Sequence, residues 1–213
     1  MQELSIGELE ALVLKACRGA GYSWGLSQDA GRAASWLAVR GLPSADLFAA
    51  FLHQIDATDP IAIAPRGLSP KVNDDSPRCP IATGALISDY GLSVDESINV
   101  GSVYAPAILI PFVASCAKTA GIGLCMRCDR TETTFCSDGQ LISSAEEIDA
   151  FTVATVSITR LDAPDELPVQ AEHRRALVAE TKLQILESLA HRTYVEASDQ
   201  SRSGAGAGLT DND

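Results

Sequence analysis

The residue types best suited to binding chemistry gather at the end of the chain, over residues 192–213. Consecutive small residues there expose backbone N–H groups, which could form a concavity that binds an anion, and two arginines could hold a carboxylate or phosphate in a bidentate manner. The candidate ligand residues of this tail are Tyr194, Ser198, Ser201, Arg202, Gly204, Gly206 and Gly208. The same Gly-, Ser- and Asp-rich composition is also typical of a flexible terminus. The residue types leave both interpretations open.

A second glycine-rich stretch, residues 18–26, carries the candidate ligand residues Arg18, Tyr22 and Trp24. Its glycines follow a helical pattern and lack the spacing of a dinucleotide-binding fingerprint, which needs a preceding strand. We therefore expect a tight turn between two helices, where an anion could bind at the N-terminus of the second helix. The alternative interpretation is a turn whose Trp24 packs on the core.

The six cysteines do not predict a metal site. Cys125 and Cys128 form a C-x-x-C pair, but no histidine lies within 30 residues of it, and zinc needs further ligands. In a strand, residues three apart point to opposite faces of the sheet. We therefore expect structural thiols, with a thiol-based redox protein as the weaker alternative.

Histidines are sparse, and only His191 lies next to the tail. It is the one candidate for acid–base chemistry. The competing interpretation is a cationic side chain that stabilises the C-terminus of a helix. No nucleophile–base motif and no pair of catalytic carboxylates can be identified, so the sequence does not decide whether the protein is an enzyme and names no cofactor.

Two motifs resemble a family of uncharacterised bacterial proteins, a domain of unknown function. The first is Lys-Ala-Cys-Arg-Gly-Ala-Gly-Tyr-Ser-Trp-Gly-Leu at residues 15–26. The second begins Arg-Thr-Tyr-Val-Glu-Ala-Ser at residue 192, continues through Ser201 and Arg202, and ends Gly-Ala-Gly-Ala-Gly-Leu-Thr-Asp-Asn-Asp. The family has Pro where this chain has Glu196. The family has no established activity, so the resemblance implies only that the tail is a recurrent motif.

Hydrophobic periodicity and capping residues predict the order of the elements. Three helices are expected at residues 5–18, 27–41 and 44–55, with Ser5 and Glu8 as a capping box and with Ser27 and Ser44 as N-caps. Strands are expected at residues 82–88, 97–104, 122–128, 133–136 and 151–160, with a turn at residues 137–139. Further helices are expected at residues 112–119, after a second capping box at residues 144–147, and as a long amphipathic helix at residues 167–191.

This order of elements predicts an α+β fold in a single domain, with a mixed or antiparallel sheet. The expected parts are a helical unit at residues 1–56, a loop at 57–78, a sheet-containing core at 79–166, and a C-terminal helix and tail at 167–213. A loop of that length is usually functional or disordered.

Composition excludes some functions. The formal charge is −12 and aromatic residues make up 5% of the chain, so neither phosphate backbones nor stacked bases would find a complementary surface, and no nucleic-acid partner is expected. The sequence has no secretory signal pattern and no apolar stretch long enough to span a bilayer. We therefore expect a cytoplasmic protein without a membrane partner.

Two functional hypotheses follow. In the first, the protein is an enzyme or a binding protein for a small anionic metabolite, with a site formed by the tail and residues 18–25. In the second, it is a noncatalytic interaction or assembly partner whose tail orders on another protein. The tail is long enough to reach a neighbouring subunit, so a homo-oligomer is compatible with either hypothesis.

Overall fold

The structure is a computed structural model that describes residues 1–68, 76–90, 97–129, 131–142, 153–161 and 172–194. Its helices are α1 Ile6–Gly19, α2 Trp24–Val39, α3 Ser44–Gln54, α4 Pro80–Tyr90, the 3-10 helix η2 Pro106–Leu109, α5 Ile110–Ala120 and α6 Glu180–His191. Its strands are β1 Gln2–Ser5, β2 Ile98–Tyr104, β3 Gly123–Cys128, β4 Thr131–Phe135, β5 Val153–Leu161 and β6 Arg175–Val178. The predicted α+β class is confirmed.

The start of α1 is set by its own sequence. The Ser5 side chain accepts a hydrogen bond from the Glu8 N–H at 3.2 Å, and the Glu8 carboxylate accepts one from the Ser5 N–H at 2.8 Å. This reciprocal pair satisfies two N–H groups that the first helical turn would otherwise leave without partners. The predicted capping box is confirmed, and these hydrogen bonds lower the pKa of Glu8.

The starts of α2 and α3 differ from the prediction. Ser23, not Ser27, caps α2 by accepting a hydrogen bond from the Leu26 N–H at 3.4 Å, so the helix begins earlier than expected. Ser27 is buried in its first turns. The first residue of α3 is Ser44, which directs its hydroxyl to the carbonyl of Ala34 at 2.7 Å and ties α3 to α2. Polar residues near helix starts thus form several kinds of hydrogen bond, which spacing alone does not distinguish.

The strand predicted at residues 82–88 is wrong, because these residues lie in α4. Pro80 occupies the first helical position, where its missing N–H and fixed φ angle suit a helix. The Cys79 thiol accepts a hydrogen bond from the Ala82 N–H at 3.4 Å in place of a conventional cap. The helix is apolar on several sides, so its hydrophobic pattern lacks the 3.6-residue period that identifies an amphipathic helix.

Four antiparallel strands form the main sheet, in the order β2-β5-β3-β4. The strands predicted from residues 97, 122, 133 and 151 correspond to these four, although residues 151 and 152 lie outside the described part. The helix predicted after Pro111 is α5, and Gly121 ends it with a φ of 63°. The turn predicted at residues 137–139 is also present, with Gly139 at a φ of 81°.

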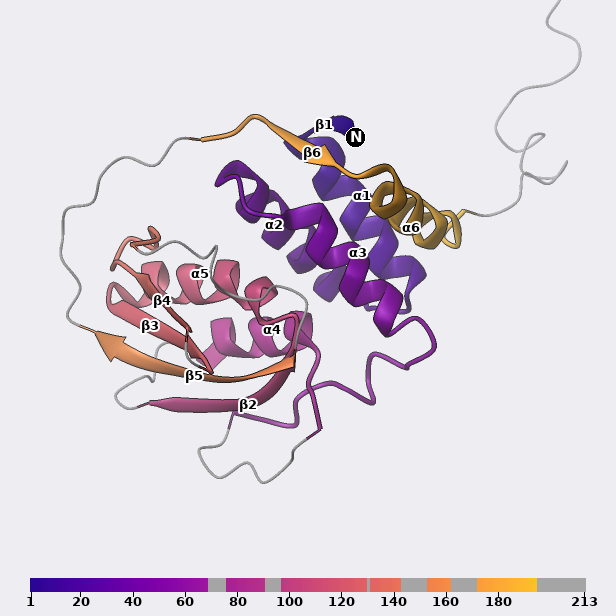
Figure 1. Cartoon of the computed structure of the whole chain (residues 1–213). Helices are drawn as coiled ribbons and strands as arrows, with labels where there is room; N and C mark the ends of the chain where they lie inside the picture. The colour runs from indigo at the N-terminus through magenta and orange to yellow at the C-terminus, as the bar shows by residue number, and fades with distance from the viewer. Residues whose placement is uncertain (69–75, 91–96, 130, 143–152, 162–171, 195–213) are drawn as a thin grey trace, which may run out of the picture.

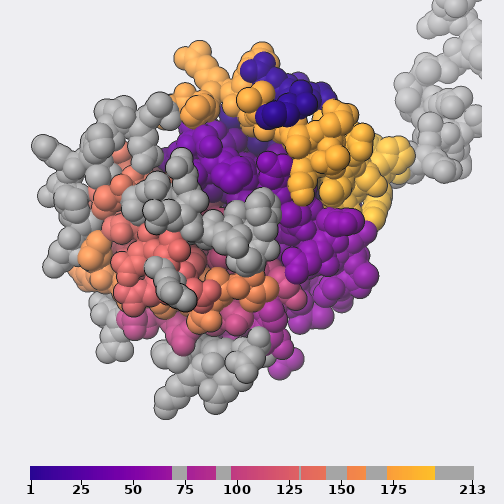
Figure 2. All heavy atoms as spheres, in the orientation of Figure 1, coloured from indigo at the N-terminus to yellow at the C-terminus, as the bar shows by residue number. Residues whose placement is uncertain are grey.

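The long helix predicted at residues 167–191 is wrong. Of that range, residues 167–171 lie outside the described part, Arg175–Val178 form β6, and only the 12 residues of α6 are helical. β6 pairs antiparallel with β1 at the other end of the sequence, with Gln2 opposite Val178. Figure 2 shows these two segments, indigo and orange, against one another at one end of the molecule.

Residues 57–68 and 76–78 contain turns and bends but no helix or ladder strand, as the loop prediction requires. Backbone hydrogen bonds attach the end of the loop to its neighbours. The Cys79 N–H donates to the Ile63 carbonyl at 2.8 Å, and Arg78 forms a parallel bridge with Val103 of β2. The second predicted capping box, residues 144–147, lies outside the described residues.

The elements form layers (Figure 1). α4 and α5 lie between the four-stranded sheet and a helical group of α1, α2, α3 and α6. A continuous cluster of buried side chains runs through both parts, from Leu9 of α1 to Met126 of β3. Within the described residues, no helix is both long and apolar enough to cross a membrane.

Candidate anion-binding site

The connection between α1 and α2 is short and rigid. The N–H of Ala20 donates to the carbonyl of Ala16 at 2.9 Å, and that of Tyr22 donates to the carbonyl of Cys17 at 3.1 Å. Gly21 adopts a φ of 94°, a left-handed conformation that glycine accepts without a steric penalty. The sequence prediction of a tight turn between two helices therefore holds, with the turn completed before Trp24.

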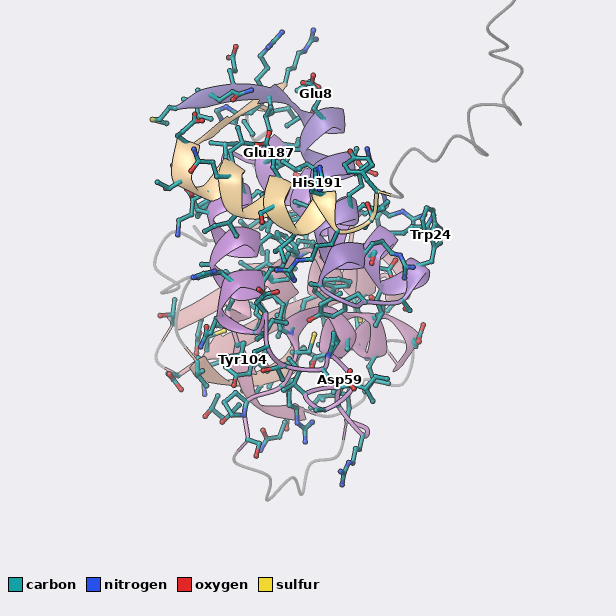
Figure 3. All side chains as sticks on the ribbon, turned by 90° about the vertical axis from the view of Figure 1, so that its right-hand side faces the viewer. Glu8, Trp24, Asp59, Tyr104, Glu187 and His191 are labelled. Atoms are coloured by element: carbon teal, nitrogen blue, oxygen red, sulfur yellow. The ribbon has the colours of Figure 1, made fainter. Side chains whose placement is uncertain are left out.

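Arg18 and Trp24 are neighbours on the surface of this turn. Arg18 donates a hydrogen bond from Nη1 to the carbonyl of Tyr22, and its guanidinium carbon lies 5.9 Å from the centre of the Trp24 ring. Trp24 is 60% exposed and projects outward in Figure 3, so it does not pack on the core. A cation stacked near an aromatic face keeps its remaining N–H donors available to a ligand.

Tyr22 lies in the core, apart from the other two candidate residues of this loop. It is 1% exposed, and its hydroxyl is 3.2 Å from the sulfur of Cys79. Burial, followed by the neighbouring Cys79, raises the pKa of Tyr22, and burial raises the pKa of Cys79. The contact anchors the turn to the start of α4, which gives Tyr22 a positioning role relative to Arg18 and Trp24.

The end of α6 packs directly on the end of α1. A Cβ atom at Gly19 would lie 1.8 Å from the carbonyl oxygen of Leu189, so only glycine permits this approach of the two helices. The close contact brings Tyr194 beside α1, with its hydroxyl 3.4 Å from the Nζ atom of Lys15 and its ring centre 5.5 Å from the same nitrogen. Tyr194, the last described residue of the tail, therefore lies one helical turn from Arg18.

The candidate tail residues after Tyr194 lie outside the described part of the chain. These are Ser198, Ser201, Arg202, Gly204, Gly206 and Gly208. Of the candidate ligand residues, the structure therefore places Arg18 and Trp24 together on the surface, Tyr22 beneath them, and Tyr194 beside the same helix.

An ion pair fixes the other side of this junction. Arg192 donates two hydrogen bonds to Asp56, at 2.5 and 2.9 Å, and so links the end of α6 to the end of α3. The hydrogen bond from Arg192 lowers the pKa of Asp56. The pair borders a hollow of about 340 Å³ whose wall includes His53, Gln184 and Ser188.

Lys15 was not among the predicted ligand residues. Lys15 and Arg18 are three residues apart on an exposed face of α1, which places their side chains on the same side of the helix. Within the described part, no carboxylate lies within ion-pair distance of either side chain. The spacing of Lys15 and Arg18 was visible in the sequence, but the proximity of Lys15 to Tyr194 depends on the packing of α6 on α1.

Comparison with known proteins places the α1–α2 turn in a recurrent segment. Residues 4–79 match the family model described as a protein of unknown function (DUF3726). The DUF3726 match includes the first of the two motifs that carried the resemblance, and the second motif, at the tail, lies beyond it. No curated protein and no solved structure matches the chain.

The DUF3726 segment ends at a residue with a structural role. Cys79, its last matched residue, contacts Tyr22 of the first motif in the core. The segment also contains Lys15, Arg18, Gly19 and Trp24. The described half of the candidate site therefore comes from this segment, except for Tyr194.

Within the described residues, the cysteines outside the DUF3726 segment show no metal-binding arrangement. Cys125 is half-buried and Cys128 is buried on the opposite face of β3, as strand geometry predicts, and burial raises the pKa of Cys128 to about 12. Among the described residues, all six cysteines are free thiols and no cluster of three His, Cys, Asp or Glu side chains could hold a metal ion.

His191 lies in the last turn of α6, where a cationic imidazole would interact favourably with the helix dipole. Its ring centre is 5.5 Å from that of Tyr194, at an interplanar angle of 75°. Figure 3 shows His191 and Trp24 on the same side of the molecule. The edge-on ring contact helps to orient Tyr194 above Lys15.

Proposed function

We propose that the protein binds a small anionic metabolite at the junction of the α1–α2 turn and the end of α6. The observation that carries this proposal is the contact of Tyr194 with Lys15, because it starts the tail one helical turn from Arg18. The tail continues after Tyr194 and contains the predicted donors Arg202, Gly204, Gly206 and Gly208.

The described residues supply a cationic half-site. Lys15 offers an ammonium group and Arg18 a planar fork of N–H donors, which suits a carboxylate or phosphate. The N-terminus of α2 adds backbone N–H groups beside Trp24. The side-chain cap there is a long hydrogen bond of 3.4 Å, which the Leu26 N–H donates to the Ser23 hydroxyl. Tail N–H groups would complete the coordination of the anion. In this proposal Ser198 and Ser201 orient the ligand.

The alternative function is a noncatalytic partner surface. Trp24 is 60% and Tyr194 58% exposed, and exposed Trp, Tyr and Arg side chains are enriched at the centres of protein interfaces. In this case the same junction, together with the tail, would contact another protein instead of a metabolite.

Thermal unfolding with a panel of anions tests the proposal. We expect phosphate, pyrophosphate or a small polycarboxylate to raise the melting temperature of the full chain, since a ligand at 100 times its Kd stabilises by about 2.7 kcal/mol. The Arg18→Gln variant should lose most of this gain. Arg160→Gln, which removes an exposed cation at the end of β5, is the matched control and should keep it.

Deletion of residues 203–213 separates the two hypotheses. Under the metabolite proposal the deletion abolishes the anion-dependent gain. If the gain survives both the deletion and Arg18→Gln, the anion binds elsewhere and the proposal fails. If no anion in the panel stabilises the full chain, and Trp24→Ala and Tyr194→Ala instead abolish co-purification of a partner protein, the interface function replaces it.

A further inference from the structure

A second hollow lies where α2, α4 and α5 meet, and none of the residues proposed for the anion site lines it. It has a volume of about 400 Å³, within the range of small-molecule sites. The middle of α2, the second half of α4 and the first turns of α5 form its walls. We call it the three-helix groove.

Two aromatic side chains, held in place by their neighbours, form the apolar walls of the three-helix groove. The Arg40 guanidinium lies 3.7 Å from the centre of the Trp36 ring and donates to the Trp36 carbonyl at 3.3 Å. Phe112 lies flat against Gly84, where a Cβ atom would approach its ring to 2.4 Å. These contacts restrain both rings in the free protein, and preordered side chains limit the entropic cost of binding.

Ser88 and Asp89 offer hydrogen-bond acceptors on one wall of the groove. The Ser88 hydroxyl donates its proton to the Gly84 carbonyl at 3.1 Å, so only its lone pairs remain for a ligand. Asp29 already has a cationic partner, Arg32, at 3.5 Å. Asp89, next to Ser88, has no cation within ion-pair distance among the described residues.

We infer that the three-helix groove binds a small organic cation, a protonated amine on an apolar body. The ammonium group would donate to Asp89 and Ser88, while the body of the ligand lies between Trp36 and Phe112. The lining charges, Asp29, Arg32 and Asp89, sum to −1, and the guanidinium of Arg40 against Trp36 offsets this charge. The overall charge of the chain, −12, favours a cation.

Tryptophan fluorescence provides a direct test, because the chain has two tryptophans. In a Trp24→Phe background the remaining fluorophore is Trp36 in the groove wall. Titration with 2-phenylethylamine should change its emission in a saturable way. The neutral isostere 2-phenylethanol should bind about two- to fivefold more weakly, as expected for loss of a partly exposed ion pair.

Two variants and a control locate the site. Asp89→Asn should weaken amine binding by about two- to fivefold, and Ala85→Leu, which fills the groove, should abolish the emission change. Glu187→Gln removes the same charge from the exposed face of α6 (Figure 3), a helix that contributes no residue to the groove, and should leave the affinity unchanged.

The inference is overturned if amine and alcohol bind equally, if Asp89→Asn has no effect, or if no saturable change occurs at millimolar amine. Melting temperatures of each variant confirm that the fold is intact. Because the anion site shares no residue with this groove, neither result bears on the proposed function.

Discussion

At the scale of single residues, the ion pair of Arg192 and Asp56 is the clearest polar link between the end of α6 and the rest of the helical group. Its two hydrogen bonds are short, but the side chains are 46% and 38% exposed. Water and salt screen such a pair, so its contribution to stability is at most about 1 kcal/mol. Its main effect is to hold the end of α6, which precedes Tyr194, beside the end of α3.

The direction of the Asp56 pKa shift predicts how the contribution of this pair to stability depends on pH. The pKa of Asp56 is lowered in the folded state, so the pair stabilises the protein above the pKa of the unfolded carboxyl, about 3.9, and the contribution is lost as the pH falls through the folded pKa. Arg192→Gln should therefore lower the free energy of unfolding at pH 7 by up to about 1 kcal/mol.

Urea unfolding at pH 7 and at a pH well below 3.9 measures this difference. In acid the variant and the natural protein should have the same free energy of unfolding, because Asp56 is then protonated in both. A difference of equal size at both pH values would show that Arg192 acts through packing and not through its charge.

At the scale of elements, the packing of α1 on α6 depends on Gly19. The absence of a side chain lets the carbonyl of Leu189 approach the α1 backbone, and the same contact brings Arg192 within 3.4 Å of the position of a Cβ atom at Gly19. Because the atoms in the way are backbone atoms, a larger residue can be accommodated only by separating the two helices.

Gly19→Ala should destabilise the protein by about 1–3 kcal/mol, the range for overpacking a well-packed contact. Gly7 is the matched control in the same helix, since a Cβ atom there meets nothing within 4 Å. Gly7→Ala should have no cost and should stabilise by up to about 1 kcal/mol through helix propensity. Equal effects of the two substitutions in chemical unfolding would contradict the close helix contact.

At the scale of the whole molecule, the DUF3726 segment and the sheet share buried contacts. Tyr22 meets Cys79 at the start of α4, Arg78 forms a bridge with Val103 of β2, and α2 packs on both α4 and α5. A core that continues across two structural groups favours cooperative unfolding.

The single-domain prediction can be tested by two probes. Both tryptophans lie in α2, so their fluorescence reports on the helical group, whereas circular dichroism reports on all elements. We expect the two urea transitions to coincide, as two-state unfolding requires. Separate midpoints would show that the helical group and the sheet unfold as independent domains.

Local sequence determined the elements whose signals are short-range. The Ser5–Glu8 box started α1, Gly121 ended α5, and the strand pattern around residues 122–136 predicted a β-hairpin, because caps, left-handed glycines and alternation act within a few residues. The tight turn that carries Arg18 and Trp24 was predictable for the same reason.

Only the tertiary structure decided the rest. β6 exists because β1 lies beside it, and α4 is helical although its apolar pattern did not identify a helix face, because its sides are buried against different neighbours. The position of Tyr194 over Lys15, and the core position of Tyr22 against Cys79, arise from contacts between residues far apart in the sequence. Such contacts form when helices and strands pack, and no local pattern encodes which distant partner a side chain meets.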